Sequence, residues 1–181
     1  MTKRTVLASA ATAAALITGA GTIAASYDDD HGSGKRRLKA DLRGFNEVST
    51  VSSAARGSFQ ATLSADETSI EYRLRFWDLE GSVTQAHIHL GDHHTNGGIS
   101  VWLCGTTDLP GPANTPSCGG PQSGDVSGTL TAEQVIGPSG QGIAAGEFEE
   151  LVRAIRGGVT YANVHSTLFT GGEIRGQIRA D

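Results

Sequence analysis

Four of the six histidines fall between positions 87 and 94 of the sequence. His87 and His89 are separated by one residue in segment 83–90, whose apolar pattern predicts a β-strand. Alternate side chains of a strand point to the same face with Cα atoms about 7 Å apart, so both imidazoles can reach one ion. His165 ends another predicted strand, 160–166, and supplies a third nitrogen if the two strands are neighbours. The spacing therefore predicts a metal site.

His93 and His94 follow in the next loop and can complete the ligand set. Three or four imidazoles without a thiolate suit copper, zinc or iron, and an exported β-sandwich protein favours copper among them. The alternative is structural, because an H-x-H pattern on a solvent-facing strand is often polar surface, with Ile88 turned toward the core. Both interpretations remain open from the residues alone.

The start of the sequence indicates export. Lys3 and Arg4 precede an apolar stretch over 6–23 and small residues at 24–26, which is typical of a secretory signal peptide. A membrane anchor is the alternative, but polar residues dilute the stretch and three aspartates follow at 28–30. We expect a signal peptide over 1–25, a flexible charged linker over 26–37 and one folded domain over 38–181. The expected product is secreted or extracytoplasmic, with no stable membrane anchor.

Export determines how the two cysteines are interpreted. Cys104 and Cys118 flank a segment rich in Gly, Pro, Thr and Asn, with almost no apolar residue. In an oxidising compartment this pattern predicts a disulfide that closes a long loop. A zinc site built on thiolates needs closer pairs such as C-x-x-C, which the sequence lacks.

Composition excludes several classes of protein. The 14 Lys and Arg against 19 Asp and Glu give a net charge of −5, which opposes binding to a phosphate backbone, so we expect no nucleic-acid partner. The 25 glycines and 18% charged residues argue against a helical bundle or a coiled coil. Ser139 lies in Gly-Pro-Ser-Gly, which is not the strand–turn–helix setting of a nucleophile elbow.

Period-two alternation of apolar residues runs through most of the chain from Leu38 onward. It predicts strands over 57–63, 70–76, 83–90, 99–103, 125–130, 160–166 and 173–179. One short helix is predicted over about 147–156, with acids in its first turns, arginines near its end and Gly157 as the stop. About eight short strands and one helix predict an all-β protein, an antiparallel Greek-key β-sandwich.

Five segments resemble, in order, the motifs of the CHRD (chordin-type) domain. They are GFNEV at 44–48, AHIHLG at 86–91, NGGISV at 96–101, YANVH at 161–165 and GEIRGQI at 172–178. The resemblance covers about residues 38–180. It implies a secreted or cell-surface protein, because CHRD domains are known from such proteins. In chordin they accompany domains that bind growth factors. It names no protein partner for this chain.

A looser similarity links His87, His89, Gly91 and Asp92 to the H-x-H and Gly-Asp region of copper/zinc superoxide dismutases. Those enzymes are Greek-key sandwiches with an intrachain disulfide and an arginine that guides the anion to copper. The similarity implies His87, His89 and His165 as copper ligands, and Arg175 as the catalytic anion guide for superoxide. No zinc-loop pattern is evident, so a copper-only site is the implied analogue.

Two hypotheses of different class follow. The first is an exported metal-binding protein, most simply a copper protein, with superoxide dismutase-like activity as an open question. The second is a noncatalytic extracellular interaction or structural module whose histidines serve the fold. Arg175 has a structural alternative as well, as an ion-pair partner of Glu173 or Glu47. Tyr161 and Asn163 share the face of His165 and are either donors that orient an imidazole or plain sheet residues.

Overall fold

The computed structural model describes residues 36–180, which form one continuous antiparallel sheet of nine strands and one α-helix. The strands are β1 (Arg36–Arg43), β2 (Arg56–Leu63), β3 (Ile70–Trp77), β4 (Val83–Leu90), β5 (Ile99–Gly105), β6 (Gly124–Leu130), β7 (Thr160–Ser166), β8 (Ile174–Gln177) and β9 (Arg179–Ala180). The expected signal peptide over 1–25 lies outside the described residues, as does most of the expected linker. Strand β1 begins at Arg36, two residues before the expected start of the domain.

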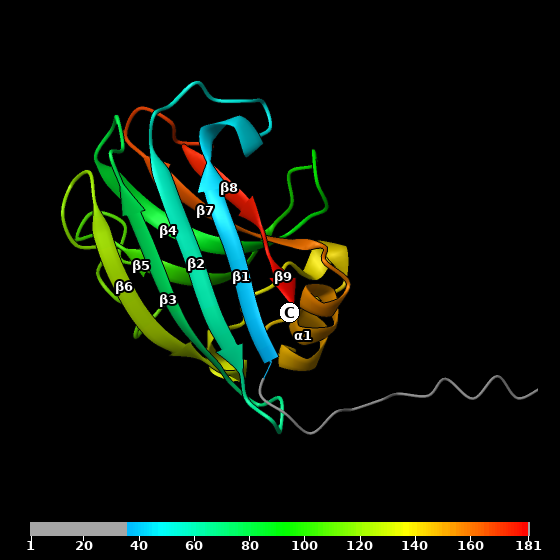
Figure 1. Ribbon diagram of the computed structural model, residues 1–181. Coiled ribbons are helices and arrows are strands. Elements are labelled where there is room, and N and C mark those ends of the chain that lie inside the picture. The colour runs from blue at the N-terminus through cyan, green and yellow to red at the C-terminus, as the bar shows by residue number, and fades with distance from the viewer. Residues whose placement is uncertain (1–35, 181) are drawn as a thin grey trace, which may run out of the picture. The chain divides into compact units, whose positions relative to one another are not determined.

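The strands pair in the order β5-β4-β7-β8-β1-β2-β3-β6, and β9 pairs with β1. The sheet folds over, so that β2, β3 and β6 lie in front of β4, β5 and β7 (Figure 1). Pairing of β1 with both β2 and β8 makes the two layers continuous. The all-β antiparallel fold is therefore confirmed, and the two layers belong to a single sheet rather than to two separate ones.

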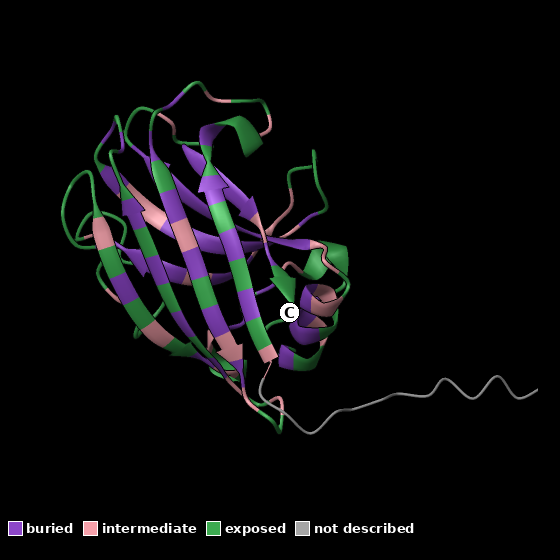
Figure 2. Ribbon diagram, viewed as in Figure 1, coloured by how far each residue is buried: buried purple, intermediate pink, exposed green. Residues whose placement is uncertain are grey.

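The front layer has one dry face and one wet face, as the alternation predicts. Ile70, Tyr72, Leu74 and Phe76 of β3 are buried, whereas the residues between them are exposed (Figure 2). Strands β1 and β2 alternate in the same way, and their inward side chains join β3 in one hydrophobic core. Burial of this face stabilises the folded state, because burial of apolar surface is the main favourable term in the free energy of folding.

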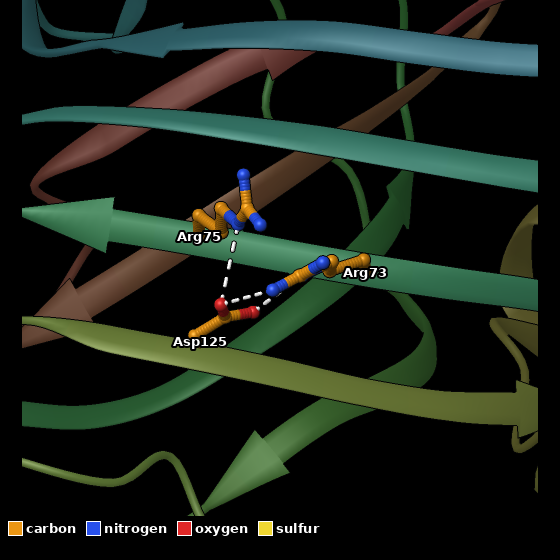
Figure 3. Close-up of polar contacts among 3 residues, drawn as sticks. All are labelled: Arg73, Arg75 and Asp125. Atoms are coloured by element: carbon orange, nitrogen blue, oxygen red, sulfur yellow. Dashed lines mark hydrogen bonds and ion pairs between the residues drawn. The ribbon is translucent and has the colours of Figure 1, made fainter.

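Charged side chains occupy the wet face of the front layer. Asp125 of β6 accepts hydrogen bonds from Nε of Arg73 at 2.7 Å and from Nε of Arg75 at 3.2 Å, both on β3 (Figure 3). All three side chains are about half exposed, with values between 47% and 50%. Solvent screens exposed pairs of this kind, so the cluster adds little to the stability of the sheet.

The rear layer departs from simple alternation, because β7 is buried along its whole length and four consecutive residues of β4 are buried (Figure 2). One face of these strands packs on the core through residues such as Ile88, Ala162 and Val164. The opposite face carries polar side chains, yet loops cover it. A polar face that is buried must find partners or a ligand for its donors and acceptors.

The single helix, α1 (Phe148–Arg156), confirms the prediction over about 147–156. Its stripe of Phe148, Leu151, Val152 and Ile155 is buried, and Gly157 follows its last turn. Short 3₁₀ helices occur at Gly44–Asn46, Ala132–Gln134 and Ser139–Gln141. Within residues 36–180, no helix has the length and apolar character needed to cross a membrane.

Cys104 and Cys118 form the expected disulfide, with an S–S distance of 2.07 Å and Cα atoms 4.9 Å apart. The bond joins β5 to the end of the long loop that precedes β6. Gly105 and Ser117 form a β-bridge beside it, so the loop is closed by covalent and hydrogen bonds at one point. The disulfide thereby holds the loop against β5, the strand that pairs with β4 in the rear layer.

Candidate metal centre

His87, His89 and His165 come together on the covered face of the rear layer. Each offers one ring nitrogen, and these three atoms lie within 4.8 Å of one another. Strands β4 and β7 are direct neighbours, and their register places Gln85 opposite His165 and Asn163 opposite His87. His165 is thus the diagonal neighbour of His87 on the same face, close enough for side-chain contact. The expected cluster is present.

Backbone carbonyls set the protonation of two of the rings. Nδ1 of His89 lies 3.0 Å from the carbonyl oxygen of Gly97, and Nδ1 of His165 lies 2.9 Å from that of Thr170. A carbonyl oxygen only accepts hydrogen bonds, so each Nδ1 carries the proton and donates it. Nε2 of each ring then presents a lone pair to the cluster. Metal-ligating histidines usually have such a partner on the second nitrogen.

The third imidazole completes a close group of nitrogens. Nδ1 of His87 lies 3.2 Å from Nε2 of His165. In a tetrahedral site with metal–nitrogen bonds of about 2.0–2.1 Å, two ligand nitrogens are about 3.3 Å apart. Nε2 of His87 and Nε2 of His89 are buried with no hydrogen-bond partner. An unpartnered lone pair on a buried imidazole is costly, and a cation held by Nδ1 of His87, Nε2 of His165 and Nε2 of His89 would relieve that cost at His89.

All three rings favour the neutral form that a metal needs. Burial lowers the pKa of His87 to about 2, and the neighbouring His165 and His89 contribute. Burial also lowers the pKa of His89 to about 4, although its bond to the Gly97 carbonyl opposes this. The pKa of His165 is lowered by burial too. Near neutral pH the lone pairs are therefore available without prior loss of a proton.

Aromatic rings enclose the cluster. Trp102 of β5 meets His87 edge to face at 4.4 Å between ring centroids. Tyr161 of β7 stacks on His89 at 4.8 Å with the ring planes only 4° apart. These rings fix the orientation of two imidazoles and keep bulk water away from them. The sequence places Tyr161 on this face, whereas the contact of Trp102 with His87 follows from the pairing of β4 with β5.

Arg175 of β8 extends the stack beyond Tyr161, with its guanidinium carbon 3.4 Å from the centroid of the tyrosine ring. It donates hydrogen bonds to the carbonyl oxygens of Thr95 at 2.8 Å and Asp92 at 2.9 Å. The residue is only 2% exposed. Arg175 therefore anchors the loop that covers His89. Glu173, one of the two ion-pair partners suggested for Arg175, instead accepts a hydrogen bond of 2.8 Å from Oγ of Ser53.

A buried carboxylate lies behind the cluster. Oε1 of Glu47 accepts a hydrogen bond of 2.6 Å from Nδ2 of Asn163, which also donates to the carbonyl of Ile174. Burial raises the pKa of Glu47 to about 7, while Asn163 and the charge of Arg175 lower it in part. The sequence suggests Glu47 only as an ion-pair partner of Arg175, and not as a buried acid beside the histidines. Its place inside the 44–48 motif segment, next to Val48, is the signal that could have indicated it.

His93 and His94 do not join the cluster. Both are exposed, and both line a separate pocket together with Arg43 and Arg179. They sit at the outer turn of the 91–98 loop, whereas Gly97, near the loop's end, contacts the cluster. The structure therefore brings together three of the five histidines expected as ligands.

A family model of the CHRD domain matches residues 38–178. The chain belongs to the CHRD domain family. A search of the curated proteins gives no match. In this CHRD domain the five motif segments, far apart in sequence, meet around the histidines. Glu47 bonds Asn163, Gly97 bonds His89, and the side chain of Asn96 donates to the carbonyl of Val48. The residues that carry the family resemblance are those that build the cluster.

Proposed function

We propose that this CHRD-domain protein is exported and binds one transition-metal ion, copper, through His87, His89 and His165. The observation that carries the proposal is the buried, unpartnered Nε2 of His89 beside the close approach of Nδ1 of His87 to Nε2 of His165. Three neutral imidazoles packed against one another would stabilise an apolar core less than leucine or valine side chains would. A shared cation gives all three a partner.

Copper is favoured over other metals by the donor set. The described cluster contains imidazole nitrogens and no carboxylate, which disfavours magnesium, calcium and manganese. Both cysteines of the chain are consumed by the disulfide. Among divalent ions of the first row, copper binds nitrogen ligands most tightly. The disulfide also supports an oxidising, extracytoplasmic location.

We extend the proposal to superoxide dismutase-like activity. Bound copper would supply a one-electron redox couple. The contribution of the chain is to hold the three rings, to limit water with Trp102 and Tyr161, and to provide positive potential from Arg175. Because Arg175 is buried and engaged with two carbonyls, it would act on superoxide through its field rather than by direct contact.

Metal binding is tested by loading the purified protein with copper or zinc, dialysing it and measuring bound metal. We expect about one equivalent of copper, with nitrogen hyperfine structure in the electron paramagnetic resonance spectrum. His89→Gln should lose the ion, whereas the matched control His94→Gln, an exposed histidine of the adjoining loop, should retain it. Equal retention by both variants would refute the site, and preference for zinc would refute copper.

Activity is tested on the copper-loaded protein in the presence of a chelator that removes free copper. Superoxide dismutation should exceed that of His89→Gln and should fall in Arg175→Met, with Arg75→Gln as a matched control on the exposed face. If the loaded protein is no faster than His89→Gln, the redox proposal fails and metal binding stands alone. If the metal test fails as well, the noncatalytic module is what remains.

A further inference from the structure

Positive residues stand directly opposite one another on the outer face of β1. Arg43 of β1 pairs with Arg175 of β8. Lys39 of β1 pairs with Arg179 of β9. Like charges at directly opposed positions of a sheet destabilise it. An anion bound beside these pairs would be attracted by both members of each pair.

A pocket of about 370 Å³ lies over this face. Its walls include the four opposed cations, the exposed Phe45 and the two histidines that do not join the metal cluster; the lining is Lys39, Ala40, Asp41, Arg43, Phe45, Asn46, His93, His94, Arg175, Gln177 and Arg179. Asp41 is the one carboxylate in that lining. The local charge is thus positive in a chain whose net charge is −5. A cleft lined by one sign of charge concentrates ligands of the opposite sign.

The dimensions indicate a ligand with more than one anionic group. Lys39 and Arg43 are four residues apart on β1, which corresponds to about 13 Å along a strand. Asp41 lies between them on the same face and keeps the two cationic pairs apart. Pockets of a few hundred cubic ångströms accommodate small organic molecules. Phe45, which is 66% exposed, offers an apolar wall for the carbon skeleton of such a molecule.

We propose that this pocket binds a small organic polyanion, a molecule that carries two or more carboxylate or phosphate groups. The guanidinium groups of Arg43 and Arg179 form the exposed contacts, because a planar fork of N–H donors matches the oxygens of both groups. Arg175 forms the buried floor and adds charge. Its floor position is fixed by the carbonyls of Asp92 and Thr95, so the pocket is formed before a ligand arrives.

The proposal does not depend on the metal centre. The pocket uses the outer turn of the 91–98 loop, through His93 and His94, while Gly97 of the same loop faces His89. A protein without metal therefore retains the pocket. Binding should be measured on metal-free protein, prepared with an immobilised chelating resin because soluble chelators are themselves polycarboxylates.

Isothermal titration with citrate, fructose 1,6-bisphosphate, inorganic phosphate and acetate tests the pocket. We expect saturable binding of citrate or fructose 1,6-bisphosphate, and none of acetate or inorganic phosphate at the same concentration, because a single anionic group cannot engage both cationic pairs. Binding of citrate alone would assign carboxylate groups, and binding of the sugar bisphosphate without citrate would assign phosphate groups. Inorganic phosphate that binds as tightly as either would overturn the polyanion proposal. Arg43→Gln and Arg179→Gln should each weaken binding at least about tenfold, which is the loss of one charge-assisted contact. Arg75→Gln, on the exposed face of β3, should change it less than about twofold.

Thermal melting shows whether a variant that loses binding is still folded. Because Arg43→Gln removes one of two opposed arginines, it should melt at or above the temperature of the unmutated protein without ligand. A lower melting temperature would show that Arg43 supports the fold and would overturn the opposed-charge argument. The proposal is also overturned if no probe binds at millimolar concentration, or if Arg75→Gln weakens binding as much as Arg43→Gln does.

Discussion

Replacement of Glu47 by glutamine tests the electrostatics of the covered face directly. Glu47 is 6% exposed, and burial raises its pKa from 4.5 to about 7. The folded chain therefore holds this proton more tightly than the unfolded chain does. The stability that Glu47 contributes is fully present below pH 4.5 and is lost as the pH rises through about 7. Glutamine keeps an oxygen that accepts from Asn163, but it cannot ionise.

The magnitude follows from the two pKa values. Each unit of difference between them corresponds to about 1.4 kcal/mol, so complete ionisation costs the folded state about 3.4 kcal/mol. Between pH 5 and 8 the proton is almost completely lost, which accounts for about 2.5 kcal/mol of this. The stability of Glu47→Gln relative to the unmutated protein should therefore rise by about 2.5 kcal/mol over that interval.

Urea unfolding of the metal-free proteins at pH 5, 6, 7 and 8, followed by tryptophan fluorescence, measures this difference. The buried histidines titrate in both proteins, so their effect cancels when the two free energies of unfolding are subtracted. Glu71→Gln, at an exposed position of β3, is the matched control for the loss of one carboxylate. A difference for Glu47→Gln that stays constant within about 0.5 kcal/mol, or that falls as the pH rises, would refute the reasoning.

Three further outcomes are expected. Burial lowers the pKa of His89 to about 4, so its contribution to stability is complete above about pH 6.5 and is lost as the pH falls toward 4. At pH 5 the metal-free protein should have lost about 2 kcal/mol of its free energy of unfolding through this residue. His89→Gln should lack that part of the pH dependence in acid-unfolding titrations. Thiol labelling of the denatured, unreduced protein should detect no free Cys104 or Cys118, and reduction should lower the free energy of unfolding by roughly 3 kcal/mol. Gly172→Ala should destabilise the fold by about 1–3 kcal/mol, because the φ of Gly172 is +130° and a Cβ there would lie 2.6 Å from Nδ2 of Asn163. Gly171→Ala, with open space around it, should melt like the unmutated protein.

Local patterns predicted most elements of the domain, although β1 (Arg36–Arg43) was not among the predicted strands and the predicted strand over 173–179 is divided into β8 and β9. Alternation with period two predicted a strand over 70–76, observed as Ile70–Trp77, because a strand with one dry face must place every second side chain in the core. The same rule placed His87 and His89 on one face of β4. The acids, arginines and glycine around 147–157 predicted α1 for reasons that act within a few residues.

The sequence could not decide which strands are neighbours, since pairing depends on contacts between residues far apart in the chain. His165 joins the histidines of β4 because β7 pairs with β4, whereas His93 and His94, much closer in sequence, point elsewhere. Nor does alternation indicate whether the second face of a strand meets water or a loop. Loop 91–98, held by Arg175, covers that face in the rear layer. That cover shifts the pKa values of His89 and Glu47, because the penalty for a charge depends on the water removed around it and not on the residue's neighbours in sequence.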